Sequence, residues 1–108
     1  MEKDQEEKIQ QLQLIEQNMQ NFSAQKQNAQ MQLLEAESAL KELEKVESGY
    51  KIIGNIMIQT DKAQLITELK SKKEISELRI KTLETSEDKL KAKAAKIKSE
   101  VLGSMKNE

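Results

Sequence analysis

Apolar residues recur through the first half of the chain at alternating steps of three and four positions. A heptad pattern of this kind, sustained over several repeats, is typical of a coiled-coil seam. Lys26 is the only polar member of the series, and we expect its stem to pack while its ammonium group stays in solvent. We predict a helix over about residues 5–47 with a seam of Leu12, Ile15, Met19, Phe22, Ala29, Leu33, Ala36, Leu40 and Leu43.

The second half of the chain repeats this spacing with more polar interruptions. Asp61, followed three residues later by Gln64, matches a capping box at a helix start, and Gly103 is typical of a helix end. Glu87 and Lys91 have the spacing of an ion pair along one helix. We predict a helix over about residues 61–103 with a seam of Ile66, Leu69, Lys73, Ser76, Ile80, Leu83, Glu87, Leu90, Ala94, Ile97 and Val101.

Between these segments lies YKIIGNIMIQTD, residues 50–61, the one stretch without a helical pattern. Gly54-Asn55 between apolar flanks predicts a two-residue turn and hence a β-hairpin over about residues 50–60, and Gly49 suits the left-handed position that ends a helix. The predicted register sets Ile53 opposite Ile56. Side chains alternate across strands, so Ile53, Ile56 and Ile58 share one face, and Tyr50, Ile52 and Met57 share the other.

Two helical segments of nearly equal length around a short hairpin predict a mainly α fold, a long antiparallel two-helix coiled coil. The chain ends would then meet at its tip. An isolated hairpin is marginal in water, and this one is apolar on both faces. We expect it to pair with equivalent hairpins of other chains in a shared sheet or barrel; the alternative is packing on its own helix ends. The predicted oligomerisation residues are Tyr50, Ile52, Ile53, Gly54, Asn55, Ile56, Met57 and Ile58.

Apolar residues near both chain ends exceed what seam pairing needs, since Leu14 and Leu102 lie off the seam. Flexible apolar side chains at such a tip can adapt to many partners. The alternative is that they are ordinary seam and surface residues. The predicted client-binding residues are Ile9, Leu12, Leu14, Ile15, Met19, Ile97, Val101, Leu102 and Met105. Whether the tips or the inner faces of the helices dominate client binding stays open.

Composition argues against several other functions. The chain is 34% charged and 2% aromatic and has no Pro, Cys or His, so the common metal ligands and catalytic bases are missing. We expect no enzyme activity, no cofactor and no metal. A net charge of -1 gives no reason to expect nucleic acid or membrane binding, and the lysines of KLKAKAAKIK fit a solvated face or, alternatively, an acidic docking partner. The polar N-terminus and short apolar runs predict neither a signal peptide nor a membrane span, and hence a cytoplasmic chain.

The segment YKIIGNIMIQTDKAQLITEL, together with QKQNAQMQLLEAESALKELEKV before it, resembles the beta-type subunits of the prefoldin family of archaeal and eukaryotic co-chaperones. Tyr50, Lys51, Gly54 and Lys62 carry the resemblance, which covers nearly the whole chain as a single domain over residues 1–108. The short spacer between Val46 and Tyr50 departs from the family pattern. An alpha-type subunit would carry two hairpins, whereas this chain has one.

The resemblance implies a heterohexamer of two alpha-type and four beta-type subunits, whose hairpins form a β-barrel body. It implies an ATP-independent holdase that binds unfolded proteins at the coiled-coil tips and passes them to a group II chaperonin. The alternative function is a structural coiled-coil scaffold or tether that the hairpin only oligomerises. An apolar excess at the tip distinguishes the two, because a scaffold does not need it.

Overall fold

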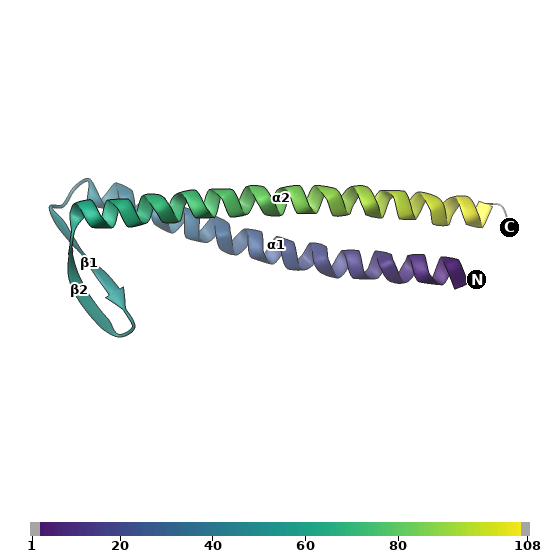
Figure 1. Cartoon of the computed structure of the whole chain (residues 1–108), viewed down its shortest axis with the longest axis horizontal. Helices are drawn as coiled ribbons and strands as arrows, with labels where there is room; N and C mark the ends of the chain where they lie inside the picture. The colour runs from purple at the N-terminus through teal and green to yellow at the C-terminus, as the bar shows by residue number, and fades with distance from the viewer. Residues whose placement is uncertain (1–2, 107–108) are drawn as a thin grey trace. The chain divides into compact units, whose positions relative to one another are not determined.

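The computed structural model of this chain describes residues 3–106 and contains two long helices separated by a β-hairpin. The order is α1 (Lys3–Leu43), β1 (Ser48–Ile53), β2 (Ile56–Asp61) and α2 (Lys62–Lys106) (Figure 1). This confirms the predicted mainly α fold with a single hairpin. Neither helix, over the described residues, is both long and apolar enough to span a membrane.

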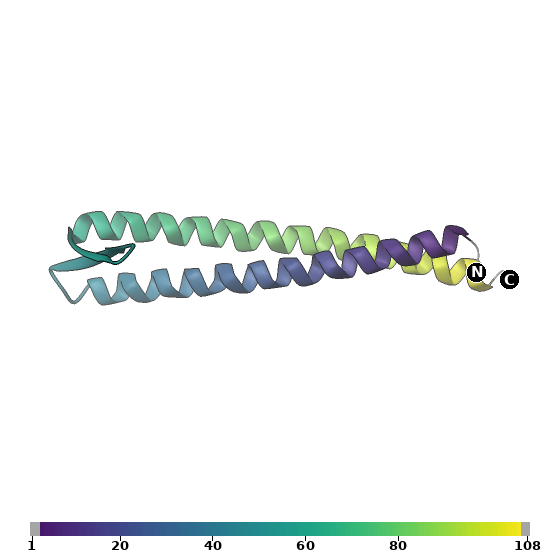
Figure 2. The same cartoon turned by 90° about the horizontal axis from the view of Figure 1, so that it is seen from below.

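The chain forms two compact units. The terminal unit comprises Met1–Lys26 and Lys81–Glu108, and the hairpin unit comprises Gln27–Ile80. Each unit pairs a segment of α1 with an antiparallel segment of α2, and the hairpin belongs to the second unit (Figure 2).

The predicted seam is buried in the terminal unit and continues toward the chain ends through polar residues. Ile15, Leu83 and Ile97 are buried, as the heptad spacing predicts. Gln5 is also buried, with 2% of its surface exposed, and its Nε2 donates a hydrogen bond to Ser104 Oγ at 3.0 Å. Lys8 Nζ lies 3.5 Å from Glu100 Oε2. The outer end of the seam is therefore held by polar contacts, which the apolar pattern did not reveal.

Two polar interruptions of the predicted seam meet each other. Lys26 Nζ donates to Glu87 Oε1 at 2.8 Å, although 61 positions separate the two residues. The expectation that the Lys26 ammonium stays in solvent was therefore wrong. Glu87 is buried and pairs with Lys26 across the seam rather than with Lys91 along its own helix. The hydrogen bond to Glu87 raises the pKa of Lys26.

The seam of the hairpin unit is built largely from small side chains. Ala29 and Ala36 of α1 are buried, and so is Ser76 of α2, so the polar residue that interrupts the apolar series still occupies its seam position. Near the hairpin the seam ends in Leu43 and Leu65. Leu65 lies beside the predicted seam residue Ile66 and is buried because the start of β1 packs on it.

Helix α1 ends at Leu43, four residues before the predicted boundary at 47. A tight turn follows, in which the Lys45 and Val46 amides donate to the carbonyls three residues earlier, at 3.1 and 3.4 Å. Such bonds satisfy carbonyls that a helix end leaves unpaired. The predicted left-handed Gly49 is wrong, because Gly49 lies in β1 without a positive φ. A Cβ there would lie 2.7 Å from Leu65 Cδ1, so close packing explains this glycine.

Helix α2 starts directly after β2 and continues past its predicted end. The helix was predicted to end at Gly103, but it runs through this glycine to Lys106. Ser104, one residue further on, contacts Gln5, so tertiary packing outweighs the roughly 1 kcal/mol helix penalty of glycine. At the other end, Gln64 donates to Glu68 at 3.4 Å instead of completing the predicted capping box.

The hairpin has the predicted register, with Ile53 opposite Ile56, Ile52 opposite Met57 and Lys51 opposite Ile58. Gly54 has a φ of 60°, and among the described residues no non-glycine has a positive φ. A positive φ at the first turn position alone is the pattern of a type II′ turn, which requires glycine there. The Gly-Asn dipeptide thus fixes both the turn and the register.

Candidate functional site

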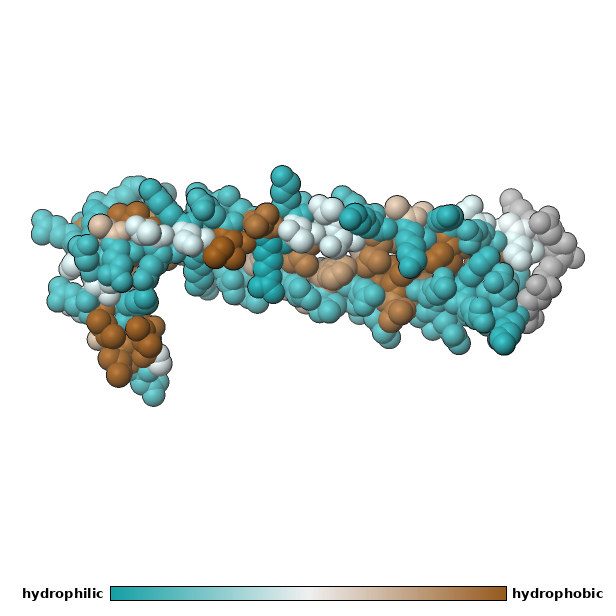
Figure 3. All heavy atoms as spheres, in the orientation of Figure 1, coloured by the Kyte–Doolittle hydropathy of each residue, from teal (hydrophilic) through white to brown (hydrophobic). Residues whose placement is uncertain are grey.

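The hairpin presents apolar side chains to solvent on both of its faces. On one face the exposed fraction falls between 45% for Ile58 and 63% for Ile56, and on the other it reaches 70% for Ile52. Figure 3 shows the hairpin as a nearly continuous hydrophobic surface on the side in view. The rival expectation, that one face would pack on the chain's own helix ends, fails for the six apolar residues Tyr50, Ile52, Ile53, Ile56, Met57 and Ile58.

Only the base of the hairpin lies against the helices. Gly49 there lies close to Leu43 and Leu65. A hollow of about 480 Å³ opens beside this contact, and its apolar lining includes Val46, Tyr50 and Leu69. The hairpin is thus attached at its base, while its outer strands and turn stay uncovered.

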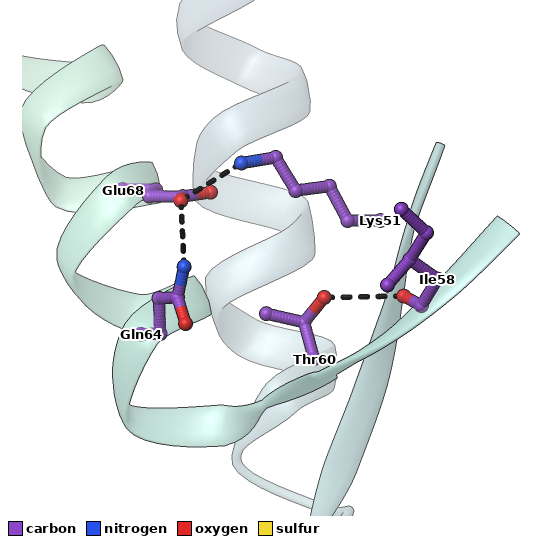
Figure 4. A network of polar contacts seen from close by, with 5 residues as sticks. All are labelled: Lys51, Ile58, Thr60, Gln64 and Glu68. Atoms are coloured by element: carbon purple, nitrogen blue, oxygen red, sulfur yellow. Dashed lines mark hydrogen bonds and ion pairs between the residues drawn. The ribbon is translucent and has the colours of Figure 1, made fainter. Parts of the chain in front are cut away.

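A polar network holds the Lys51-bearing face of β1 in place against α2. Lys51 Nζ donates to Glu68 Oε1 of α2 at 2.9 Å, and Gln64 Nε2 donates to the same oxygen at 3.4 Å (Figure 4). Thr60 Oγ1 donates to the carbonyl of Ile58 within β2 at 3.1 Å. The hydrogen bond from Lys51, followed by that from Gln64, lowers the pKa of Glu68. Lys51, which the family resemblance singled out, therefore sets the hairpin against α2.

The terminal unit contains all nine residues predicted to bind clients, but they differ in accessibility. Ile15 and Ile97 are buried in the seam, so they hold the helices together and are not available to a client. Ile9, Leu12, Met19 and Val101 are half-buried. The exposed members are Leu14, Leu102 and Met105.

Three of the half-buried residues lie together in one groove. Ile9, Leu12 and Met19 of α1 line a hollow of about 420 Å³, opposite Ala94 of α2. Lys91 and Lys98 also line it, although the sequence prediction had treated them only as part of a basic run. Their position directly after the seam residues Leu90 and Ile97 is the signal that places both lysines beside the seam.

The hairpin unit carries further exposed apolar side chains that the sequence prediction missed. Leu34 is 65% exposed and Ile75 is 63% exposed, and Met31 and Leu78 are exposed to a similar extent. All four lie off the heptad seam, which is the pattern that could have revealed them. They provide exposed apolar side chains outside the terminal unit, with which that unit can be compared in experiments.

Among the described residues the carboxylates do not gather into a metal-binding cluster. Over residues 3–106 no cluster of three or more Asp, Glu, His or Cys side chains could hold a metal ion. The glutamates with partners, such as Glu68 and Glu87, are engaged by lysines. The surfaces that stand out are apolar, and they suit binding to other polypeptides.

Comparison with known proteins places these features in one family. The family described as "Prefoldin subunit" matches residues 6–107. The chain is 42% identical over 94 residues to the prefoldin subunit beta of Thermococcus onnurineus, which is 84% of this chain and 81% of that protein. It is 40% identical over 90 residues to the prefoldin subunit beta of Archaeoglobus fulgidus, covering 81% and 78% of the two chains.

A solved structure shows the same fold. The crystal structure of the prefoldin beta subunit from Thermococcus strain KS-1 matches with a TM-score of 0.85 and 31% sequence identity. The match covers 95% of this chain and 93% of that one. The resemblance to beta-type subunits seen in the sequence is therefore confirmed.

Proposed function

Because this chain belongs to the prefoldin family of chaperone subunits, we propose that it works as a beta-type subunit of an ATP-independent holdase. Prefoldin subunits form complexes with other prefoldin subunits. For this chain we infer a heterohexamer of two alpha-type and four beta-type subunits in the cytoplasm. It would bind unfolded proteins and deliver them to a group II chaperonin.

The uncovered hairpin is the observation that carries the proposed assembly. Its apolar residues are exposed on both faces, and a two-stranded sheet leaves the outer edge of each strand without a backbone partner. Pairing with hairpins of other subunits would satisfy these edges and bury the isoleucines, each worth roughly 1.5–3 kcal/mol. A β-barrel shared between subunits meets both requirements.

Client binding is proposed for the terminal unit. Its exposed Leu102 and Met105 and the groove of Ile9, Leu12 and Met19 offer apolar surface without a deep, rigid pocket. Such a surface suits many unfolded segments, because flexible Leu, Ile and Met side chains can repack around different partners. Weak contacts on several subunits would add up through avidity.

The rival function is a structural scaffold or tether that uses the hairpin only to assemble. A scaffold gains nothing from exposed apolar side chains in the terminal unit. Removing them would leave a scaffold unchanged but would weaken a holdase. The two functions therefore differ in one measurable property.

The test compares two triple variants in complex with the partner subunits. One changes Ile9, Leu102 and Met105 to Ser; the matched control changes Met31, Leu34 and Ile75 to Ser in the hairpin unit. We expect the first to suppress aggregation of a diluted, denatured test protein several-fold less well, with unchanged helicity by circular dichroism. Absence of suppression by the wild-type complex would favour the scaffold, and equal suppression by wild type and both variants would place client binding on other residues. A loss confined to the control would move client binding to the exposed apolar residues of the hairpin unit.

A further inference from the structure

The apolar groove of the terminal unit has a cationic border. Lys91 and Lys98 line it together with Ile9, Leu12 and Met19. Over the described residues neither lysine forms an ion pair or a side-chain hydrogen bond, whereas Lys8 and Lys26 both pair with carboxylates. Two free ammonium groups thus stand beside an apolar floor.

Local charge around this groove differs from that of the whole chain. Residues 89–99 contain five lysines and no acid, although the net charge of the chain is -1. Across the groove, residues 9–19 of α1 contribute a single charge, that of Glu16. Glu16 also lines the groove, so its lining carries two lysines against one carboxylate. An incoming segment therefore meets a positive potential that Glu16 cancels only in part.

The two bordering lysines occupy equivalent positions on α2. They are seven residues apart, so they lie on one side of the helix at a separation of about 10 Å. Roughly three residues of extended polypeptide span that distance. Lys98 also lines the neighbouring hollow, which contains the exposed Leu102, so apolar and cationic groups alternate along this side.

The remaining lysines of the basic run do not border the groove. Lys89, Lys93 and Lys96 are absent from its lining, and their heptad positions place them on the opposite flank of α2. In a general solvated basic face, the two lysines at the groove and the other three lysines would have equivalent surroundings. The groove therefore offers a specific combination of charge and apolar surface.

We propose that this groove selects unfolded client segments in which acidic residues flank large apolar ones, an inference that rests on the proposed holdase function. The apolar side chain of the client packs against Ile9, Leu12 and Met19, and the flanking carboxylates approach Lys91 and Lys98. One exposed charge pair changes affinity by at most about fivefold, so two such pairs give a preference of roughly tenfold. The groove thus biases capture without restricting it to one sequence.

The test measures peptide binding to the assembled complex by fluorescence anisotropy. Three labelled, unstructured peptides of equal length are compared: one alternates Glu with Leu and Phe, one replaces Glu by Lys, and one keeps Glu but replaces the apolar residues by Ser. We expect the first peptide to bind about tenfold more tightly than the second. The preference should shrink at 0.5 M salt to about twofold, because screening weakens exposed charge pairs.

Matched charge reversals locate the effect. Lys91→Glu with Lys98→Glu should abolish or invert the preference, whereas Lys93→Glu with Lys96→Glu, which changes the net charge equally, should retain most of it. If both variants lose the peptide preference equally, the groove does not select the peptide. The long-range electrostatic field of the basic run would then be the cause. Tight binding of the Ser-containing acidic peptide would also overturn it, because any polyanion, including nucleic acid, would then suffice.

Suppression of aggregation by the same complexes separates this inference from the proposed function. A wild-type complex that protects a denatured protein but shows no peptide preference overturns the inference alone. A wild-type complex that protects no client and binds none of the peptides overturns both. Protection of a client by Lys93→Glu with Lys96→Glu, whose lysines lie outside the groove, should equal that by wild type.

Discussion

Lys26 and Glu87 place opposite charges in the seam of the terminal unit, where an all-apolar heptad would have Leu or Ile. Their hydrogen bond is short, and Glu87 is buried, so each group depends on the other for its stability in the seam. A polar pair at a seam position also disfavours other helix registers, since a shifted register would strand both charges. The sequence pattern identified each residue only as a polar interruption of the apolar seam. It did not show that the two residues meet, because that depends on how α1 and α2 align.

Removing one partner should be worse than removing both. Glu87→Leu leaves the Lys26 ammonium without its carboxylate, and we expect the thermal midpoint of helicity to fall by about 5 °C. Lys26→Leu combined with Glu87→Leu restores an apolar seam and should raise the midpoint above that of the single variant. Melting curves by circular dichroism measure both. If the effects of the two single substitutions simply add in the double variant, the residues are not coupled.

The ion pair of Lys51 and Glu68 makes the attachment of the hairpin sensitive to acid. The pKa of Glu68 is lowered in the folded chain from its usual value of 4.5. The stabilising contribution is therefore complete above that value and is lost as the pH falls through the lowered pKa. We expect amide exchange in β1 to accelerate below about pH 4.5, after correction for intrinsic rates, and Glu68→Gln to remove this pH dependence. Unchanged pH dependence in the variant would show that other carboxylates cause it.

At the scale of whole elements, the sequence predicted both helices, the strands and their register, but it misplaced the helix ends. The three glycines of the chain show the reason, because each has a different structural role. Gly54 supplies a positive φ in the turn, Gly49 leaves room for Leu65, and Gly103 lies inside α2. Sequence alone assigned a helix end to both Gly49 and Gly103, because local context does not show which neighbour packs against them. The strand register was predictable because the turn itself fixes it.

The same substitution should have opposite effects at two of these glycines. Gly49→Ala places a Cβ against Leu65 and should destabilise the hairpin unit by about 1–3 kcal/mol. At Gly103 no atom lies within 4 Å of the added Cβ, so Gly103→Ala should stabilise α2 by up to about 1 kcal/mol. Urea unfolding followed by circular dichroism gives both values. Stabilisation by Gly49→Ala would show that Leu65 moves aside without cost.

At the scale of the whole molecule, the distribution of apolar surface implies that the chain works as part of an assembly. The seam buries apolar residues within each unit, whereas the hairpin leaves six of them exposed. The sequence could predict this exposure because residues on both faces of a two-stranded sheet are apolar and nothing in the chain was left to cover them. The heptad pattern also separated the buried seam residue Ile15 from Leu14 and Leu102, which lie off the seam and are exposed. It did not show that Ile9, Leu12 and Met19 would line one groove, because that depends on how the two helices align.

Charged substitutions in the hairpin test the proposed assembly directly. In a barrel shared between subunits, Ile53→Asp or Ile58→Asp would bury a carboxylate, which costs several kcal/mol per subunit and removes an apolar contact worth roughly 1.5–3 kcal/mol. In the isolated chain both isoleucines are at least 45% exposed, so the helices should fold normally. Mixed with the alpha-type partner, these variants should yield monomers or small oligomers, as measured by light scattering after size exclusion.

The matched control is Ile75→Asp, which introduces the same charge at an isoleucine that is 63% exposed on α2, outside the hairpin. This variant should assemble like the wild type, because the proposed barrel contains only hairpin residues. If Ile53→Asp and Ile58→Asp assemble as well as the control does, the hairpin is not the joint between subunits. If all three variants fail to assemble, the interface extends from the hairpin onto α2.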